Sequence, residues 1–306
     1  MGPFTDLQSE IEKRSLSSGG WPSGKGRSAG IETTCLALMA LHDRQATARD
    51  KAVDLLLRTQ NADGSWPAFE GDDAEGCWVT ALAIVTLRFL QSPSSRIDEA
   101  LQWLLNNKGR EGHWLWGWKF RTFDRRVQFN PDKYGWSWFP GTASWVIPTS
   151  FSVLALQQSF PCCRPPHVAT RLQLGIEMLF DRACPGGGWN AGNGIVNDAA
   201  LSPHIDTTAV ALLALAEHIA EPIPIQALTW LRQASMDCSS GYSLAWSSLA
   251  FLTSQDPALD ACIARLRTAL SSTRSIPNTE TLSLAAIALD AAQGNPNPFQ
   301  VGHEHK

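Results

Sequence analysis

The stretch Pro185-Gly-Gly-Gly-Trp189, with Ser202-Pro-His-Ile-Asp-Thr-Thr-Ala-Val210 shortly after it, sets the pattern of the whole chain. Glycines precede a tryptophan, a polar loop follows, and an apolar run with helical spacing begins at Asp206. The same order occurs twice towards the N-terminus, in Gly19-Gly-Trp21 before Ile31-Glu-Thr-Thr34 and in Gly64-Ser-Trp66 before Trp78-Val-Thr-Ala81. A sequence motif that recurs in this way indicates a repeat array, in which each unit buries one face against its neighbours.

The apolar helices that follow these turns share one register. Alignment by their leucines places six residues near the starts of six helices: Glu32, Val79, Pro148, Asp206, Tyr242 and Glu280. The unit is roughly 40 residues long, which lies within the range of helical repeats, and insertions lengthen the third and fourth units. Each unit pairs an almost wholly apolar helix with an amphipathic one, and this pairing calls for two concentric layers.

We therefore predict an all-α fold, an (α/α)6 toroid of about six helical hairpins. It is a single domain over residues 1–294, and residues 295–306 are predicted to be a frayed C-terminal tail. In a closed ring the register positions lie at one end of the inner layer and face a shared cavity. Closure of the ring makes Glu32 and Glu280 neighbours. The carboxyl groups of Glu32, Glu280 and Asp206 should then point towards one shared space.

The composition argues for a large core and against two classes of partner. Hydrophobic residues make up 44% of the 306 residues and charged residues 18%. A net charge of -4 does not favour binding to nucleic acid or to an anionic membrane surface. Seven cysteines without a Cys-x-x-Cys pair argue against a disulfide scaffold, and no apolar run approaches the roughly 18 residues of a membrane span. We expect a soluble cytoplasmic protein without a signal peptide.

Thirteen tryptophans against two tyrosines are the anomaly of this composition. Such a large number of tryptophan side chains can pack the core or form the wall of a pocket for an apolar or cationic ligand. Residues 112–145 form an insertion rich in aromatic and basic side chains: Trp116, Trp118, Arg121, Arg125, Arg126, Trp136, Trp138 and Trp145. We interpret this insertion as a lid over one mouth of the ring or as a docking surface for a partner.

The turns resemble a known family. The residues Lys51-Ala52, Leu56, Gln60 and Gly64-Ser-Trp66 are similar to the QW repeat of squalene and oxidosqualene cyclases, with Leu55 where an aromatic residue is usual. Degenerate copies of this repeat contain Trp21, Trp114 and Trp189. The opening stretch looks like the cyclase segment that carries the DxDDTA acid motif. The resemblance covers nearly the whole chain and implies the α/α toroid of terpenoid cyclases and protein prenyltransferase β-subunits.

The resemblance also implies an activity, the class II cyclisation of an isoprenoid that begins with protonation. Asp206 matches the central, proton-donating Asp of the acid motif, His204 stands where the first Asp would be, and Thr207 replaces the last. Such a reaction needs a carboxylic acid in an apolar cavity and aromatic faces for the cations. Candidates for contact with the substrate, besides Thr207, are Trp78, Trp145, Tyr242, Glu32 and Glu280. Squalene cyclases use two helical domains, whereas this chain has residues for one.

Each of these assignments has an alternative. Asp206 in Asp-Thr-Thr at a helix start is also an ordinary N-terminal cap, which would lower its pKa. Prenyltransferase β-subunits bind Zn²⁺ through Asp-x-Cys and a distant His, but Asp237-Cys238 has no intervening residue, so we expect no metal and no cofactor. The alternative to an enzyme is a non-catalytic toroid that binds an apolar ligand or a second protein subunit.

Overall fold

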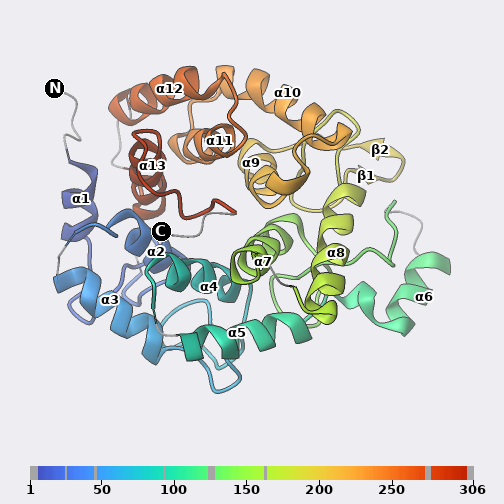
Figure 1. Cartoon of the computed structure of the whole chain (residues 1–306), viewed down its shortest axis with the longest axis horizontal. Coiled ribbons are helices and arrows are strands. Elements are labelled where there is room, and N and C mark those ends of the chain that lie inside the picture. The colour runs from blue at the N-terminus through green and yellow to red at the C-terminus, as the bar shows by residue number, and fades with distance from the viewer. Residues whose placement is uncertain are drawn as a thin grey trace.

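The structure, a computed structural model, describes residues 6–24, 26–44, 47–92, 94–122, 128–161, 164–272 and 277–301. Within these ranges six helices form an inner ring: α2 (Ile31–Ala40), α4 (Val79–Phe89), α7 (Val146–Ser159), α9 (Ile205–Ala214), α11 (Gly241–Thr253) and α13 (Thr279–Ala291). An outer layer surrounds them: α1 (Leu7–Lys13), α3 (Thr47–Arg58), α5 (Ser94–Asn106), α8 (Pro166–Asp181), α10 (Pro222–Asp237) and α12 (Leu259–Ser272). Figure 1 shows the two layers around a common centre.

The inner ring is closed. Each inner helix packs against the next one in chain order, and α13 returns to pack against α2. Each also packs against the outer helix that follows it in the sequence, and for α13 that place is taken by α1 from the other end of the chain. The predicted all-α toroid is therefore confirmed. Outside the two layers lie α6 (Trp114–Thr122), two 3-10 helices (η1, Arg110–Gly112; η2, Ala216–His218) and a hairpin of β1 (Ile195–Val196) and β2 (Ala199–Ala200).

The burial of each helix follows from its sequence. Helix α4 buries every residue from Val79 to Leu87, and α9 buries every residue from Thr207 to Ala214. The outer helix α3 buries only Ala52, Leu55 and Leu56. A helix that is apolar all round has to be enclosed by other helices, whereas a helix with one apolar stripe lies at the surface. The two types alternate along this chain and so produce the two layers.

Turn tryptophans tie the layers together by one contact that occurs four times. The backbone N–H of each tryptophan donates to a buried threonine hydroxyl on the inner helix. The indole N–H donates to a main-chain carbonyl near the end of an outer helix, which for Trp21 is the Ile11 carbonyl of α1. In the fourth unit Trp189 donates to Thr208 (2.9 Å) and to the Leu179 carbonyl (2.6 Å). The other copies pair Trp21 with Thr34 and Ile11, Trp66 with Thr80 and Leu56, and Trp136 with Thr149 and Leu104.

Glycine stands directly before the tryptophan in three of the four copies, and Ser65 takes this place before Trp66. Gly188 has φ +80°, and a Cβ atom there would lie 2.7 Å from the Thr208 hydroxyl. Any other residue would therefore be strained and would push the threonine away from the turn. This explains the Gly-Trp order of the opening stretch.

The third copy of the contact is made by Trp136, and the prediction that Trp114 makes it is wrong. Trp114 is 83% exposed in α6, whereas Trp136 is 3% exposed. The error arises because residues 110–135 are inserted between α5 and the turn, so the turn lies far from Gly112-His-Trp114. Trp136 and Trp138 therefore belong to the repeat rather than to an added segment. Arg125 and Arg126 lie outside the described residues.

Three of the four turns, those of Trp66, Trp136 and Trp189, also cap the inner helix of the preceding unit. The Ile31 N–H at the start of α2 donates to the Ala68 carbonyl, two residues after Trp66. The N–H groups of Trp78 and Val146 donate in the same way to the carbonyls of Trp138 and Ala191. These bonds satisfy helix N–H groups that have no partner within their own helix. The series ends at α9, because the fifth unit has no Gly-Trp turn and the Ile205 N–H has no such partner among the described residues.

The expectation of a frayed tail is wrong for residues 295–301, and residues 302–306 lie outside the described part. Phe299 is fully buried, and its ring centroid lies 4.9 Å from that of Trp246 and 6.3 Å from that of Phe151. The Gln158 amide donates to the carbonyls of Pro298 and Gln300. The segment after α13 thus turns into the centre of the ring (Figure 1).

The first prediction tests the tie between layers. Thr80→Val keeps the side-chain volume but leaves the Trp66 backbone N–H, which now donates to the hydroxyl at 2.9 Å, buried without a partner. We expect a loss of about 1–3 kcal/mol in the free energy of unfolding, measured by urea denaturation. The control Thr268→Val removes an exposed hydroxyl that bonds within its own helix and should change little. Equal stabilities of the two variants would contradict the proposed role of the threonine.

Candidate functional site

A cavity of about 340 Å³ opens at the end of the ring where the inner helices begin. Its walls come from α2, α4, α7, α9 and α11 and from the turns before α7 and α9. Nine of the fourteen lining residues are aliphatic or aromatic, and the polar ones are Glu32, His204, Asp206, Thr207 and Tyr242. The register predicted from the leucines therefore does bring side chains from distant repeats to one space.

Two carboxyl groups line the cavity from opposite sides. Glu32 and Asp206 are each the second residue of their helices, α2 and α9. These helices are three places apart in a ring of six, so the two residues lie across the cavity from each other. A small molecule between them would meet a carboxyl group at either end.

Burial raises the pKa of Glu32 to about 7, and the negative charge of Glu280 adds to the shift. Removal from water disfavours the charged form of a carboxyl group, and a second carboxylate nearby acts in the same direction. Burial, followed by the charge of Glu32, also raises the pKa of the Tyr242 hydroxyl. Near neutral pH a large fraction of Glu32 is therefore protonated, which is the state required of a general acid.

Glu280 lies beside the cavity but does not line it. It accepts a hydrogen bond of 2.5 Å from the Thr33 hydroxyl, which is itself 2.8 Å from the Ser23 hydroxyl. Its second oxygen, Oε2, is buried and has no hydrogen-bond partner among the described residues. The electrostatic coupling of Glu280 to Glu32 and the packing of α13 on α2 agree with the expected closeness of these residues at the ring seam.

Asp206 is not the N-terminal cap of its helix. His204 occupies the cap position of α9 and makes no side-chain capping bond, while Asp206 lies in the first turn. No hydrogen bond or ion pair joins the Asp206 side chain to another described residue. The first turn of α9 is also where the series of capping carbonyls ends. Asp206 is thus available to a ligand in the cavity. His204 is an exposed residue at the rim, and Thr207 is 4% exposed in the wall.

Aromatic rings form a continuous wall along one side of the cavity. The ring centroids of Trp78 and Trp138 are 5.2 Å apart, and those of Trp78 and Phe151 are 5.5 Å apart. The wall continues from Phe151 to Trp246 (5.9 Å) and from Trp246 to Tyr242 (6.4 Å). Phe299 does not line the cavity but packs against the rings of Phe151 and Trp246.

The sequence indicated only part of this wall. Trp78 and Tyr242 line the cavity as expected, but Trp145 lies outside it, 37% exposed, with its ring against Gly192. Trp138, Phe151 and Trp246 were missed. The signal for Trp246 was its position one helical turn after Tyr242, and that for Trp138 was its position two residues after a turn tryptophan.

The described residues contain no group of three or more His, Cys, Asp or Glu side chains that could hold a metal ion. Of the helices in those residues, none is long and apolar enough to cross a membrane. The cavity therefore offers its own side chains as chemical groups: two facing carboxyls, one phenol and several π faces.

Comparison with known proteins places the fold. No protein-family model and no curated protein matches the chain. Among solved structures, similarity is found to a novel alpha-amylase from Clostridium perfringens (10% identity, 92% of this chain and 95% of that chain, TM-score 0.63). The type II terpene cyclase MstE from Scytonema, in complex with geranylgeranyl dihydroxybenzoate, is also similar (13% identity, 94% and 96% covered, TM-score 0.59).

A third neighbour is cellobiose 2-epimerase from Spirochaeta thermophila (12% identity, 93% of each chain covered, TM-score 0.59). At these identities the likeness establishes a shared fold alone. The fold and the comparisons together define the chain as an α/α toroid. Type II terpene cyclases and a cellobiose epimerase share this fold. Membership of the QW-repeat squalene cyclase family does not follow from them.

The raised pKa of Glu32 predicts a pH dependence of stability. Glu32 holds its proton more tightly in the folded chain than in the unfolded chain, so its contribution is intact below about pH 4.5 and is lost as pH rises through about 7. The Glu32→Gln variant cannot lose a proton there. We compare the free energy of unfolding of this variant with that of the wild type at each pH. The difference, variant minus wild type, should be roughly 3 kcal/mol larger at pH 8 than at pH 4.5.

Urea denaturation at several pH values measures this difference. The control Glu99→Gln, at an exposed position of α5, should keep the wild-type pH dependence. A Glu32→Gln variant with a pH dependence identical to that of the wild type would show that Glu32 ionises normally.

Proposed function

We propose that the protein is a terpenoid-cyclase-like enzyme that protonates an isoprenoid and cyclises it within the central cavity. The observation that carries this proposal is the pairing of cavity-facing carboxyl groups, Glu32 and Asp206, with a continuous aromatic wall. A weak acid needs a poorly hydrated site to protonate an alkene, and the resulting carbocation needs nearby π electrons.

In the proposed reaction Asp206 is the acid. The Asp206 O–H bond breaks, its proton joins one carbon of the substrate double bond or the oxygen of an epoxide, and a cation forms on the adjacent carbon. The π electrons of the next double bond attack this cation and close a ring. Loss of a proton from the last cation to a basic group or to water then restores an alkene. Each step moves electron pairs only, so no oxidant, metal or cofactor is required.

The other lining residues have supporting roles in this proposal. Trp78, Trp138 and Trp246 present rings that stabilise positive charge as it moves along the substrate. Glu32, with a pKa raised to about 7, carries a proton in a large fraction of molecules near neutral pH and is a second source of the initiating proton. His204, at the exposed rim beside Asp206, tunes this acid without donating the proton.

The size of the cavity limits the substrate. An engineered cavity of about 150 Å³ accommodates benzene, with six carbon atoms, so a cavity of about 340 Å³ accommodates about 14 carbon atoms on the same scale. This favours linear isoprenoids of about 10 to 15 carbon atoms, smaller than the geranylgeranyl dihydroxybenzoate bound by MstE.

The fold is shared equally with an amylase and an epimerase, so the argument for an isoprenoid rests on the cavity. A sugar presents many hydroxyl groups, each of which needs a hydrogen-bond partner when buried. Five polar lining residues among fourteen are few for such a ligand. The same cavity without catalysis would make the protein a binding scaffold for an apolar ligand, and the following test separates the two functions.

Asp206→Asn retains the size of the side chain and removes the acidic proton. We expect turnover of linear isoprenoids to fall by about 10²- to 10⁴-fold, the usual contribution of a general acid. Stability should change by less than about 1 kcal/mol, because the Asp206 side chain has no hydrogen-bond or ion-pair partner among the described residues and does not cap its helix. Products from substrates with 10, 15 and 20 carbon atoms are analysed by mass spectrometry.

The matched control is Asp260→Asn, since Asp260 is an exposed first-turn residue of the outer helix α12. It should retain full activity. Absence of cyclised product from the wild type with every substrate, alone or with added candidate subunits, would favour the binding scaffold. If Asp206→Asn retained full turnover, Glu32 rather than Asp206 would be the proton donor. The variant Glu32→Gln would test that assignment.

A further inference from the structure

Helix α6 presents large apolar side chains to the outside of the molecule. Trp114 is 83% exposed, Leu115 52% and Trp118 51%, and all three lie within a helix of nine residues. The helix stands beside the ring, near α8 and the β1–β2 hairpin, and not over the cavity (Figure 1). Of the 112–145 insertion, Trp138 lines the cavity, whereas none of the cavity-lining residues comes from the 110–135 segment that carries α6.

Basic side chains accompany these apolar ones. The Arg110 guanidinium lies 4.7 Å and the Lys119 ammonium 4.6 Å from the centroid of the Trp116 ring. The one nearby acidic residue within η1, Glu111, is buried at 3% exposure. The described surface of η1 and α6 is therefore both apolar and positively charged, although the net charge of the whole chain is -4.

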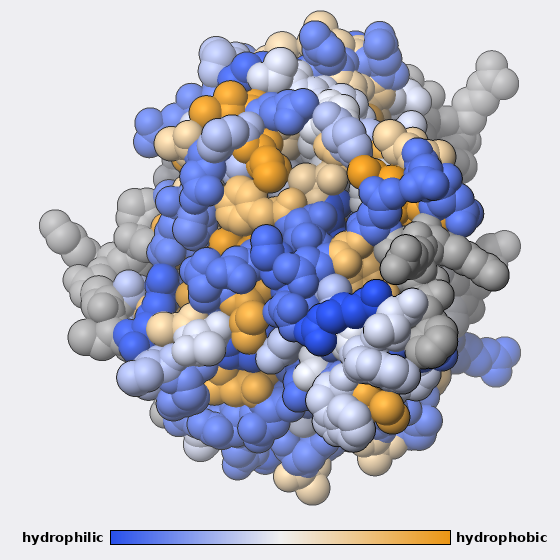
Figure 2. Space-filling view, turned by 90° about the vertical axis from the view of Figure 1, so that its right-hand side faces the viewer, coloured by the Kyte–Doolittle hydropathy of each residue, from blue (hydrophilic) through white to orange (hydrophobic). Residues whose placement is uncertain are grey.

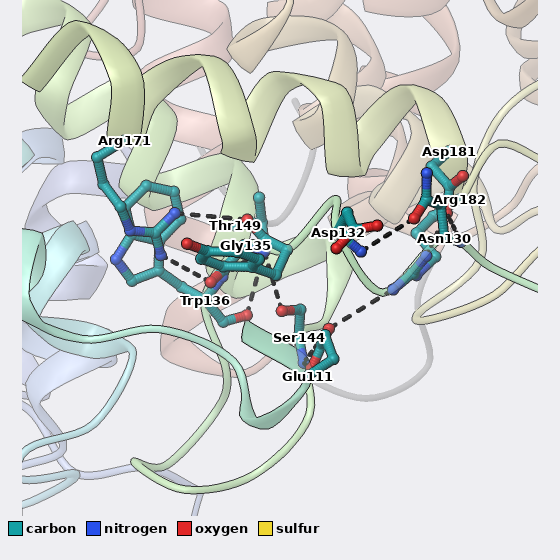
Figure 3. Close-up of polar contacts among 11 residues, drawn as sticks. Glu111, Asn130, Asp132, Gly135, Trp136, Ser144, Thr149, Arg171, Asp181 and Arg182 are labelled. Atoms are coloured by element: carbon teal, nitrogen blue, oxygen red, sulfur yellow. Dashed lines mark hydrogen bonds and ion pairs between the residues drawn. The ribbon is translucent and has the colours of Figure 1, made fainter. Parts of the chain in front are cut away.

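The segment that carries α6 is firmly held at its base. Glu111 lies 3.5 Å from Arg182 at the end of α8, and its two carboxylate oxygens accept from the Ser144 N–H (Figure 3). The Arg171 guanidinium stacks 3.4 Å from the centroid of the Trp136 ring and donates to the Gly135 carbonyl. These buried contacts connect Glu111 and Gly135, near the two ends of the segment, to the ring, and α6 packs on η1 beside Glu111.

We propose that α6 is a membrane-surface anchor that inserts Trp114 and Leu115 among the headgroups of an anionic lipid bilayer while Arg110 and Lys119 contact the lipid phosphates. Indoles favour the polar–apolar boundary of a bilayer, and basic side chains beside them bind negatively charged lipid. Insertion of a single projecting helix suits a narrow apolar surface. The side of the molecule from which α6 projects shows separate hydrophobic patches among hydrophilic residues, unlike the continuous apolar face of an obligate subunit interface (Figure 2).

The experiment is co-sedimentation of the full chain with vesicles of phosphatidylcholine alone or of phosphatidylcholine with 40% phosphatidylglycerol. No isoprenoid is present, so the result is independent of the proposed activity. The wild type should bind the anionic vesicles, bind neutral vesicles at least about fivefold more weakly, and dissociate as salt is raised. Each basic residue near an anionic surface contributes about 1 kcal/mol, which corresponds to about a fivefold change, so Lys119→Glu should weaken binding by at least that factor.

The double variant Trp114→Ser, Leu115→Ser should reduce binding at least tenfold. Its matched control is Ile225→Ser, Met236→Ser, which removes two side chains of α10 that are 51% and 54% exposed, and this control should bind like the wild type. Circular dichroism checks that all variants are folded. The proposal is overturned if the wild type ignores anionic vesicles, as it would if α6 docked another protein, or if the double variant binds as tightly as the wild type.

Discussion

The architecture depends on the buried tryptophan of each Gly-Trp turn, which joins three elements at one point. Its indole N–H donates to a carbonyl of an outer helix, and its main-chain N–H donates to a threonine of the inner helix. In three of the four turns the loop after the tryptophan also caps the preceding inner helix. The cavity residues Glu32, Trp78 and Asp206 lie at or within two residues of the inner-helix starts that these turns position. The contacts that hold the layers together therefore also set the shape of the site.

Most of the fold could be predicted from the sequence because its local signals agree with one another. Leucine periodicity marked the six inner helices, and the pairing of each with an amphipathic helix implied two layers. The errors came where a contact links residues that are distant in sequence. Nothing near Trp114 indicates that a tryptophan 22 positions later takes its expected place, and nothing in residues 295–301 indicates that Phe299 is covered by α7 and α11.

The candidate site was predictable in the part that depends on register. Of the six register positions, Glu32, Asp206 and Tyr242 line one cavity as expected, whereas Val79, Pro148 and Glu280 do not line it. The protonation state of Glu32 could not be predicted, because it depends on how deeply α13 and α2 enclose that side chain and on the charge of Glu280 across the seam. The role of Asp206 as a cap was also undecided in the sequence, since it depends on whether His204 or Asp206 begins the helix.

Phe299 gives the biosynthesis of this protein a particular order. Five of the six inner helices and their turns precede residue 254, so a nascent chain of that length already contains every lining residue of the cavity. The contacts of Phe299 with Phe151 and Trp246 can form only after α13 and the segment that follows it have been synthesised. Helix α13, which closes the ring against α2, and the Phe299 segment are thus the last parts of the fold that a growing chain can form.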